Sequence, residues 1–204
     1  MGGDAGGEAI RAPAVDDIAV ARAQEYALLA ALLARPPDAA MLKRLASIEG
    51  DETPLGFAHQ VLAKAAAVTD AAAAAHEYFE LFIGVGRGEL LPYGSYYQTG
   101  FLHERPLARL RADLAELAVE RVDGLCEPED HAGILCEIMA GLIAGEFAVP
   151  VERQQYFFDR HLAPWIRRFF ADLEAAKVAD FYRPVGVIGR VFSEIETQAF
   201  ALPG

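Results

Sequence analysis

Apolar residues recur every three or four positions along most of the chain, the spacing that lines them up on one side of an α-helix. The pattern is clearest at Leu107, Leu110, Leu114 and Leu117. A sustained alternation of apolar and polar residues, which would indicate half-buried strands, is absent. The sequence therefore predicts an all-α fold, a single-domain helical bundle of about eight to ten helices with one long central loop.

Proline, glycine and capping residues divide this pattern into segments. Residues 1–15 are rich in Gly, Asp and Pro, so we expect a mobile tail there and the helical domain over residues 16–204. Pro128 and Pro184 are each expected in the first turn of a helix, where the φ angle of proline already suits the backbone. The expected helices span residues 16–34, 38–48, 55–83 with a division near Thr69 and Asp70, 105–121, 128–146, 151–177 with an interruption at Pro164, and about 181–195.

One long irregular stretch, from Gly84 to Gly100, interrupts the helices near the middle of the chain. Long loops are uncommon inside compact domains and are more often functional than not. Its first glycines do not indicate a nucleotide site, because no strand precedes them and no Lys-Ser or Lys-Thr follows. Apolar and aromatic side chains in and beside this stretch are expected to be exposed or half-exposed, namely Leu81, Phe82, Leu90, Leu91, Tyr93, Tyr96 and Tyr97.

Charge limits the kind of partner that the chain can bind. Its 204 residues include 30 acids and 18 bases, a formal net charge of −12. Binding to a nucleic-acid backbone depends on clustered Lys and Arg, so a nucleic acid is not expected and a cationic partner is favoured. The first residues lack the basic and apolar regions of a secretory signal, and no apolar run is long enough to cross a bilayer. We therefore expect a cytoplasmic protein without stable membrane insertion.

No metal or other cofactor is expected from the side chains that could hold one. The five histidines show no ligand spacing, and the two cysteines, Cys126 and Cys136, lack the C-x-x-C pattern of zinc and thiol redox sites. Two cysteines are also too few for a disulfide framework. We expect both to be reduced, half-buried thiols.

Negative charge is concentrated between residues 113 and 137. This window holds eight acids and one base, Arg121, and so carries seven of the twelve excess negative charges. Two interpretations stay open. The acids form an ordinary solvated face, or they converge on one surface, where their field would speed the capture of a basic peptide.

The sharpest local feature is the pair Asp130–His131 near the start of an expected helix. In one interpretation the acids there complement the positive end of the helix dipole, and His131 donates a hydrogen bond in the core. In the other, the pair lies at the bottom of a groove, where the carboxylate binds a guanidinium and the imidazole bonds a peptide group. A hydrolase using His131 as base and Asp130 as orienter would need a nucleophile, and the best candidate, Ser95, lacks a G-x-S-x-G elbow.

Beyond these residues, the chain carries a series of spaced motifs. They are E-Y-F-E-L-F-I-G-V-G at 77–86, L-P-Y-G-S-Y-Y at 91–97, P-E-D-H at 128–131 followed by E-I-M at 137–139, Q-Y-F-F at 155–158 with H-L-A-P-W at 161–165, and F-Y at 181–182. In this order they closely resemble the TorD/DmsD family of molybdoenzyme maturation chaperones. The resemblance covers about residues 20–198.

The resemblance implies an all-helical, non-enzymatic, cytoplasmic chaperone. Such proteins bind the twin-arginine signal peptide and the immature catalytic subunit of a molybdenum oxidoreductase, assist cofactor insertion and proofread before export. The positions that match the peptide groove of the family are Leu81, Phe82, Gly84, Pro92, Tyr93, Ser95, Pro128, Asp130 and His131. Some members carry Glu just before the loop serine, where this chain has Gly94. His161 and Trp165 also match, but their place on an apolar stripe favours core packing.

The leading hypothesis joins the central loop to the helix start at Pro128. The apolar part of the signal would pack near Leu81, Phe82 and Tyr93, while Asp130 with its acidic neighbours would pair with an arginine. The alternatives are a hydrolase that uses His131 and Asp130, or a helical adaptor without a peptide groove. The chain would act as a monomer or as a domain-swapped homodimer.

Overall fold

The computed structural model describes residues 17–117, 119, 127–147 and 149–202. Within these ranges the chain forms ten α-helices and two short π-helical segments without any strand, which confirms the all-α prediction. The predicted tail, residues 1–15, and Cys126 lie outside the described residues. The elements are α1 (Asp17–Ala34), α2 (Ala39–Leu45), α3 (Pro54–Val68), α4 (Ala71–Tyr78), η1 (Phe79–Ile83), α5 (Gly94–Thr99), α6 (Arg105–Glu116), α7 (Ala132–Ala144), α8 (Glu152–Phe157), η2 (Phe158–Leu162), α9 (Ile166–Ala175) and α10 (Tyr182–Ala201).

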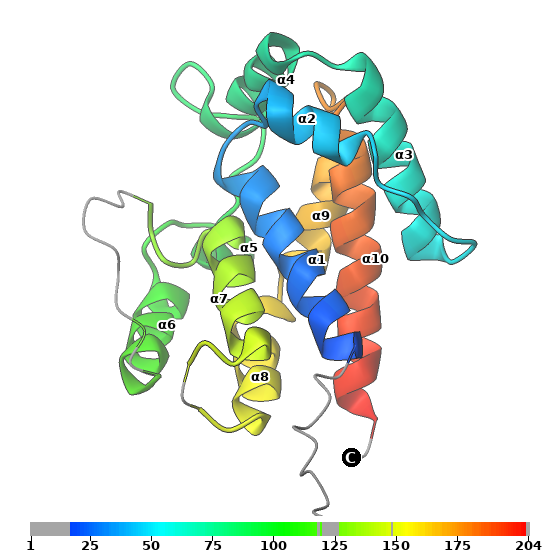
Figure 1. The fold of residues 1–204 in the computed structure, drawn as a ribbon. Helices are drawn as coiled ribbons and strands as arrows, with labels where there is room; N and C mark the ends of the chain where they lie inside the picture. The colour runs from blue at the N-terminus through cyan, green and yellow to red at the C-terminus, as the bar shows by residue number, and fades with distance from the viewer. Residues whose placement is uncertain (1–16, 118, 120–126, 148, 203–204) are drawn as a thin grey trace, which may run out of the picture.

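Helices from opposite ends of the chain pack side by side (Figure 1). α1 lies along α7, and α10 lies between α9 and α3. Apolar side chains from both halves of the chain meet in one core, whose largest fully buried members include Tyr182, Phe157, Phe158, Phe169, Phe170 and Phe181. Across the described ranges, no helix has both the length and the apolar composition that a membrane span requires.

Local capping explains why several helices begin where the sequence predicted. Asp38 accepts a hydrogen bond from the Met41 N–H at 2.7 Å at the start of α2. Asp70 accepts one from the Ala73 N–H at 2.8 Å at the start of α4, which confirms the division predicted within residues 55–83. Such side chains satisfy N–H groups that have no partner inside the helix.

The helix predicted over residues 128–146 begins later, at Ala132, so the placement of Pro128 in its first turn was wrong. His131 is the N-cap residue, and its Nδ1 accepts a hydrogen bond from the Gly133 N–H at 3.1 Å. The residues before it do not continue the helix because the Asp130 carbonyl is bonded elsewhere, by the Gly94 N–H at 2.9 Å.

The central stretch 84–100 is not wholly irregular, since its second part forms the short helix α5. This helix was missed because its N-terminal N–H groups find their acceptors on Asp130, far away in the sequence. Gly100, at φ = 84°, ends the helix in the left-handed conformation that glycine tolerates best.

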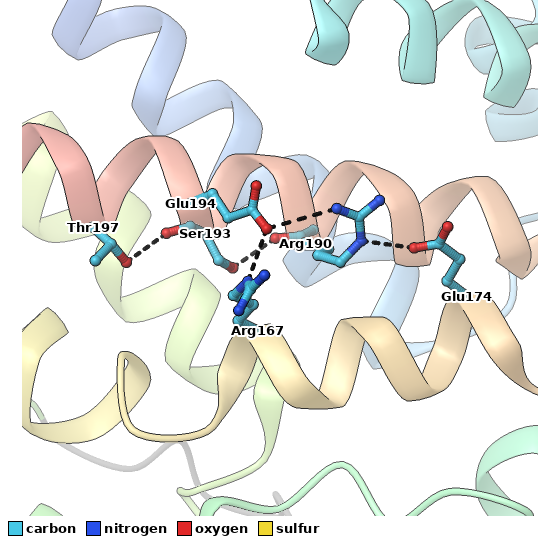
Figure 2. Close-up of polar contacts among 7 residues, drawn as sticks. Arg167, Glu174, Arg190, Ser193, Glu194 and Thr197 are labelled. Carbon is cyan, nitrogen blue, oxygen red and sulfur yellow. Dashed lines mark hydrogen bonds and ion pairs between the residues drawn. The ribbon is translucent and has the colours of Figure 1, made fainter.

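Charged side chains fasten α9 to α10 along the exposed edge of their contact (Figure 2). Arg167 of α9 pairs with Glu194 of α10 at 2.8 Å, and Arg190 of α10 pairs with Glu174 of α9 at 2.8 Å. Arg190 also reaches Glu194 at 3.7 Å, which links the two pairs.

The start of α10 is held by a carboxylate from the first half of the chain. Glu77 accepts hydrogen bonds from the N–H groups of Asp180, Phe181 and Tyr182, at 2.8, 3.0 and 2.7 Å. A carboxylate at this end of a helix is also favoured by the helix dipole. The first residue of the E-Y-F-E-L-F motif therefore has a structural role.

Cys136 is fully buried rather than half-buried, because it lies on the face of α7 that enters the core. Burial raises the pKa of its thiol to about 12. The thiol is therefore protonated and shielded, as expected of a free structural cysteine.

Candidate functional site

The loop motif and the P-E-D-H motif meet at one place in the fold. We call the segments Pro92–Ser95 and Pro128–Ala132, together, the junction. Tyr93 and His131 form an isolated antiparallel bridge. Their rings also meet edge to face, with centroids 5.3 Å apart. The predicted proximity of the central loop to the helix start is therefore confirmed.

Backbone hydrogen bonds extend the junction on both sides of this bridge. The Ala132 N–H donates to the Pro92 carbonyl at 2.8 Å, and the Gly94 N–H donates to the Asp130 carbonyl at 2.9 Å. The two motifs thus form one structural unit, although 35 residues separate Ser95 from Asp130.

Asp130 is a buried anchor of this unit, with only 3% of its surface exposed. Its Oδ2 accepts a hydrogen bond from the Ser95 N–H at 2.7 Å, in the first turn of α5. Its Oδ1 and the Ser95 hydroxyl are both buried without a hydrogen-bond partner among the described residues. A cavity of about 10 Å³, room for roughly one water molecule, adjoins Asp130 and is also lined by Arg109 and Arg160.

His131 faces inward, as predicted, but as an acceptor. Because its Nδ1 accepts from the Gly133 N–H, the neutral ring carries its proton on Nε2. Burial lowers the pKa of His131, which favours this neutral form at pH 7. The imidazole makes no hydrogen bond with Asp130, whose carboxylate instead holds α5, so the base-and-orienter pair that a hydrolase would need is not formed.

Four partly exposed side chains gather beside the junction, and we call them the tyrosine surface: Tyr78, Phe82, Tyr93 and Glu127. The Tyr93 hydroxyl donates to Glu127 Oε2 at 2.6 Å, and the rings of Tyr78 and Phe82 meet edge to face at 5.0 Å. Burial raises the pKa of Tyr78 to about 12, and the Glu127 carboxylate adds to that shift. Burial and the bond to Glu127 likewise raise the pKa of Tyr93.

The residues of the L-F-x-G motif lie in different environments. Leu81 was expected to be exposed or half-exposed, but it is fully buried because it points from η1 into the core. Phe82 is half-buried, with its ring 5.6 Å from that of Tyr182. Gly84 ends η1 at φ = 62°, and a Cβ there would lie 2.1 Å from the Arg87 carbonyl oxygen. Gly84 therefore allows the chain to turn sharply at the end of η1. π-Helical segments such as η1 are frequent at functional sites.

Position 94, where the resemblance noted above allows glutamate in some family members, is closely packed in this chain. A Cβ at Gly94 would lie 3.0 Å from Nε1 of Trp165. That indole is held in place, since its N–H donates to the His161 carbonyl at 2.7 Å. His161 and Trp165 are both buried, which confirms their predicted core packing.

The acids of residues 113–137 do not act as one free surface. Among the described ones, Asp130 is buried and Glu127 accepts from Tyr93. Three others are neutralised by arginines on the surrounding helices, in the pairs Asp113–Arg160 at 2.8 Å, Glu116–Arg153 at 3.6 Å and Glu129–Arg111 at 2.8 Å. Glu120 and Asp123 lie outside the described residues. Glu137, the remaining described acid, is exposed on α7. The described acids of this window therefore lie in different environments.

Sequence reasoning missed Tyr78 as a member of the site. The available signal was its spacing, because it precedes Phe82 by four residues and so lies on the same side of the helix. Pro128, which was predicted, is half-buried and acts through its carbonyl, which accepts from the His131 N–H at 3.1 Å. In the described part of the chain, no three His, Cys, Asp or Glu side chains are grouped as metal ligands.

The described residues thus form an all-helical fold in which two distant motifs are joined. Residues 49–171 match the family model of the nitrate reductase delta subunit. Because the match covers more than half of the chain, the protein belongs to the nitrate reductase delta subunit family.

Curated relatives confirm the resemblance to TorD/DmsD chaperones. The chaperone protein TorD of Vibrio atlanticus is 26% identical over 135 residues, which are 61% of this chain and 63% of the relative. The chaperone protein TorD of Vibrio cholerae serotype O1 is 29% identical over 104 residues, 47% of each chain. The chain thus spans less than two thirds of the length of these relatives.

A solved structure supports the fold. The crystal structure of a protein from Archaeoglobus fulgidus assigned to redox enzyme maturation superposes with a TM-score of 0.57. The match covers 85% of this chain and 93% of the other, at 19% sequence identity. At that identity the match establishes a shared helical fold and carries no argument about function.

Proposed function

We propose that this protein is a non-enzymatic, cytoplasmic chaperone that binds the twin-arginine signal peptide and the immature catalytic subunit of a molybdenum oxidoreductase. It would assist cofactor insertion and proofread the enzyme before export, acting as a monomer or a domain-swapped homodimer. Residues 16–204 would form the chaperone domain and residues 1–15 a mobile tail. The names of the curated relatives support the chaperone role.

The main support for this proposal is the arrangement of the junction and of the tyrosine surface beside it. Hydrogen bonds across the junction hold Tyr93 next to His131, and the exposed Glu127 accepts from the Tyr93 hydroxyl. A carboxylate next to aromatic rings suits a peptide in which arginines precede an apolar run. The apolar run would pack on Phe82 and Tyr93, and the arginines would approach Glu127 and Asp130.

Asp130 would have two roles in this proposal. Its Oδ2 positions α5, while its Oδ1 is a buried acceptor that no donor of the described residues reaches. Leaving a buried acceptor unpaired costs about 1–3 kcal/mol, and more for a charged group, so an arriving guanidinium that reached Oδ1 would be strongly favoured. Three more of the positions that match the family's peptide groove are also buried, and they would hold the peptide-contacting side chains in place. They are Leu81, Pro92 and Ser95.

Calorimetric titration with a signal peptide tests the proposal. The probe is the twin-arginine leader peptide of a molybdoenzyme catalytic subunit from the same organism, intact and with both arginines changed to lysine. We expect binding of the intact leader and an affinity about fivefold or more lower for the lysine version, since only arginine offers the forked geometry that matches a carboxylate. Absence of binding by both peptides would refute the proposal for that partner.

A pair of matched variants tests whether the charge of Asp130 contributes to peptide binding. Asp130→Asn should weaken binding of the intact leader at least about fivefold, and more at about 50 mM than at about 300 mM salt. Asp159→Asn removes the same charge from an exposed position on η2 and should leave binding unchanged. Equal affinities for Asp130→Asn and Asp159→Asn would remove Asp130 from peptide binding.

Two variants separate the chaperone from the adaptor without a groove. If the protein binds the leader at the junction, Tyr93→Ala and Ser95→Ala should each weaken that binding, because both positions belong to the junction. Full binding of the immature catalytic subunit by both variants would instead favour the adaptor.

A further inference from the structure

Other residues of the 84–100 segment line a second cavity, which adjoins α9. Its volume is about 280 Å³. We call it the arginine pocket, and it is lined by Arg87, Glu89, Leu90, Leu91, Tyr96, Tyr97, Gly100, Arg168 and Asp172. None of these residues belongs to the junction or to the tyrosine surface.

Two guanidinium groups lie against the tyrosine rings of this pocket. The guanidinium carbon of Arg87 is 5.3 Å from the Tyr96 ring centroid, and its Nη2 donates to the Tyr96 hydroxyl at 2.8 Å. The guanidinium carbon of Arg168 is 5.7 Å from the Tyr97 ring centroid. Cation–π contacts of this kind hold the arginines while leaving most of their N–H donors unused.

The two carboxylates of the pocket are already satisfied. Glu89 accepts from the backbone N–H groups of Lys177 and Val178, at 2.8 and 3.3 Å. Asp172 accepts from the Tyr97 hydroxyl at 2.9 Å. Arg168, by contrast, makes no hydrogen bond or ion pair with any residue in the described ranges. The hydrogen-bond donors of this pocket that have no acceptor among the described residues therefore include the N–H groups of its arginines.

Charge and size together indicate the ligand. The four charged side chains of the pocket, two arginines and two carboxylates, sum to zero, whereas the whole chain has a formal charge of −12. Guanidinium groups bind carboxylates with two parallel hydrogen bonds. Small-molecule cavities usually measure about 300–1,000 Å³, so this pocket, at about 280 Å³, suits one or two side chains.

We propose that the arginine pocket binds an acidic segment of a partner polypeptide, in which an Asp or Glu lies next to an aromatic or aliphatic residue. The carboxylate would contact Arg87 and Arg168, and the apolar neighbour would pack on Leu90, Leu91 and the tyrosine rings. The chain would then present unlike surfaces on the two sides of one segment, one for a cationic peptide and one for an acidic peptide. This inference goes beyond the proposed function and does not depend on it.

The chain contains its own reporter for this pocket. Trp165 is its one tryptophan, and the Trp165 ring lies 5.5 Å from that of Tyr97. Binding that shifts Tyr97 should therefore change the fluorescence of Trp165. Arg168 is exposed, so its replacement should leave the fold intact, and an unfolding midpoint can verify this.

The experiment is a fluorescence titration of the full chain at about 50 mM salt. The probes are the acetylated and amidated peptides Gly-Glu-Phe-Gly and Gly-Gln-Phe-Gly. We expect the glutamate peptide to bind at least about fivefold more tightly than the glutamine peptide, and Arg87→Gln or Arg168→Gln to abolish this preference. Arg168→Lys, which keeps the charge without the fork, should give an intermediate result. Arg44→Gln removes an exposed charge from α2 and should change nothing.

Three results would overturn the proposal. They are equal binding of the two peptides, an unchanged preference in Arg168→Gln, and binding of phenyl phosphate without binding of the glutamate peptide. The last result would assign the pocket to a small anionic molecule. Failure of the signal peptide to bind would leave all of these results unaffected, so the two proposals can be refuted separately.

Discussion

The two sides of the 84–100 segment differ in how they are held. On the junction side, backbone hydrogen bonds and the buried Asp130 carboxylate fasten the segment to the start of α7. On the pocket side, the segment meets α9 through side chains, with the Arg168 guanidinium against the Tyr97 ring and the Tyr97 hydroxyl on Asp172. The first side is therefore part of the rigid frame, whereas the second can adapt to a ligand at small cost to the fold.

The largest expected effect is at Asp130. Asp130→Ala would leave the buried Ser95 N–H without an acceptor, and we expect the free energy of unfolding to fall by about 1–3 kcal/mol. Asp130→Asn keeps an oxygen in reach of that N–H and should lose less. Urea unfolding measures both variants, and equal losses would mean that the charge of Asp130, rather than its role as an acceptor, stabilises the junction.

His131 gives the junction a dependence on pH. Its pKa in the folded state lies below the ordinary value of 6.5, because burial disfavours the charged ring. As the pH falls below about 6.5, the unfolded chain takes up a proton that the folded chain resists, so stability decreases by up to about 1.4 kcal/mol per pH unit. His131→Asn, which can still cap α7, should make this loss shallower in unfolding measurements between about pH 7 and pH 5.

Two other histidines serve as references for this measurement. Burial also lowers the pKa of His161, so part of the acid-induced loss should remain in His131→Asn. The bond to Glu25 raises the pKa of His59, so its contribution is present below about pH 6.5 and is lost as the pH rises. An acid-induced loss of stability that is identical in wild type and His131→Asn would contradict the role assigned to His131.

The smallest expected effect is on the pocket side. Tyr97→Phe removes the hydrogen bond to Asp172, which should cost about 0.5–1.5 kcal/mol of unfolding free energy. The released carboxylate would also compete with an acidic peptide for the guanidinium groups, so the glutamate peptide should bind more weakly. If Tyr97→Phe were as destabilising as Asp130→Ala, the contrast between the two sides would be wrong.

Helix positions were largely predictable because their signals are local. Asp38 and Asp70 cap helices within three residues of themselves, and Pro164 separates η2 from α9 as expected. The helix expected over residues 38–48 ends earlier, at Leu45, and the last helix runs beyond 195 to Ala201. Two further exceptions, α5 and the start of α7, share one cause. Both depend on hydrogen bonds between residues 92–95 and 128–132, which no short window of sequence contains.

Candidate site residues could be named from motifs, but their roles could not. The sequence indicates exposed positions for Leu81 and Asp130, whereas the fold buries Leu81 completely and leaves Asp130 3% exposed, with its Oδ2 bonded to the Ser95 N–H. Conversely, the motifs did not indicate Tyr78 or Arg168. The ring of Tyr78 packs against that of Phe82, and the guanidinium of Arg168 lies against the ring of Tyr97. A motif specifies residue types and their order, whereas exposure depends on what packs above each side chain.

The sequence by itself determined the helical class, most helix boundaries and the family resemblance, because periodicity, capping residues and motif spacing are properties of neighbouring positions. Only the tertiary structure decided that Asp130 holds α5, that arginines pair with three of the six described acids between residues 113 and 137, and that Arg87 and Arg168 line one pocket. These outcomes depend on contacts between distant segments. Their partners are chosen by packing of the whole core.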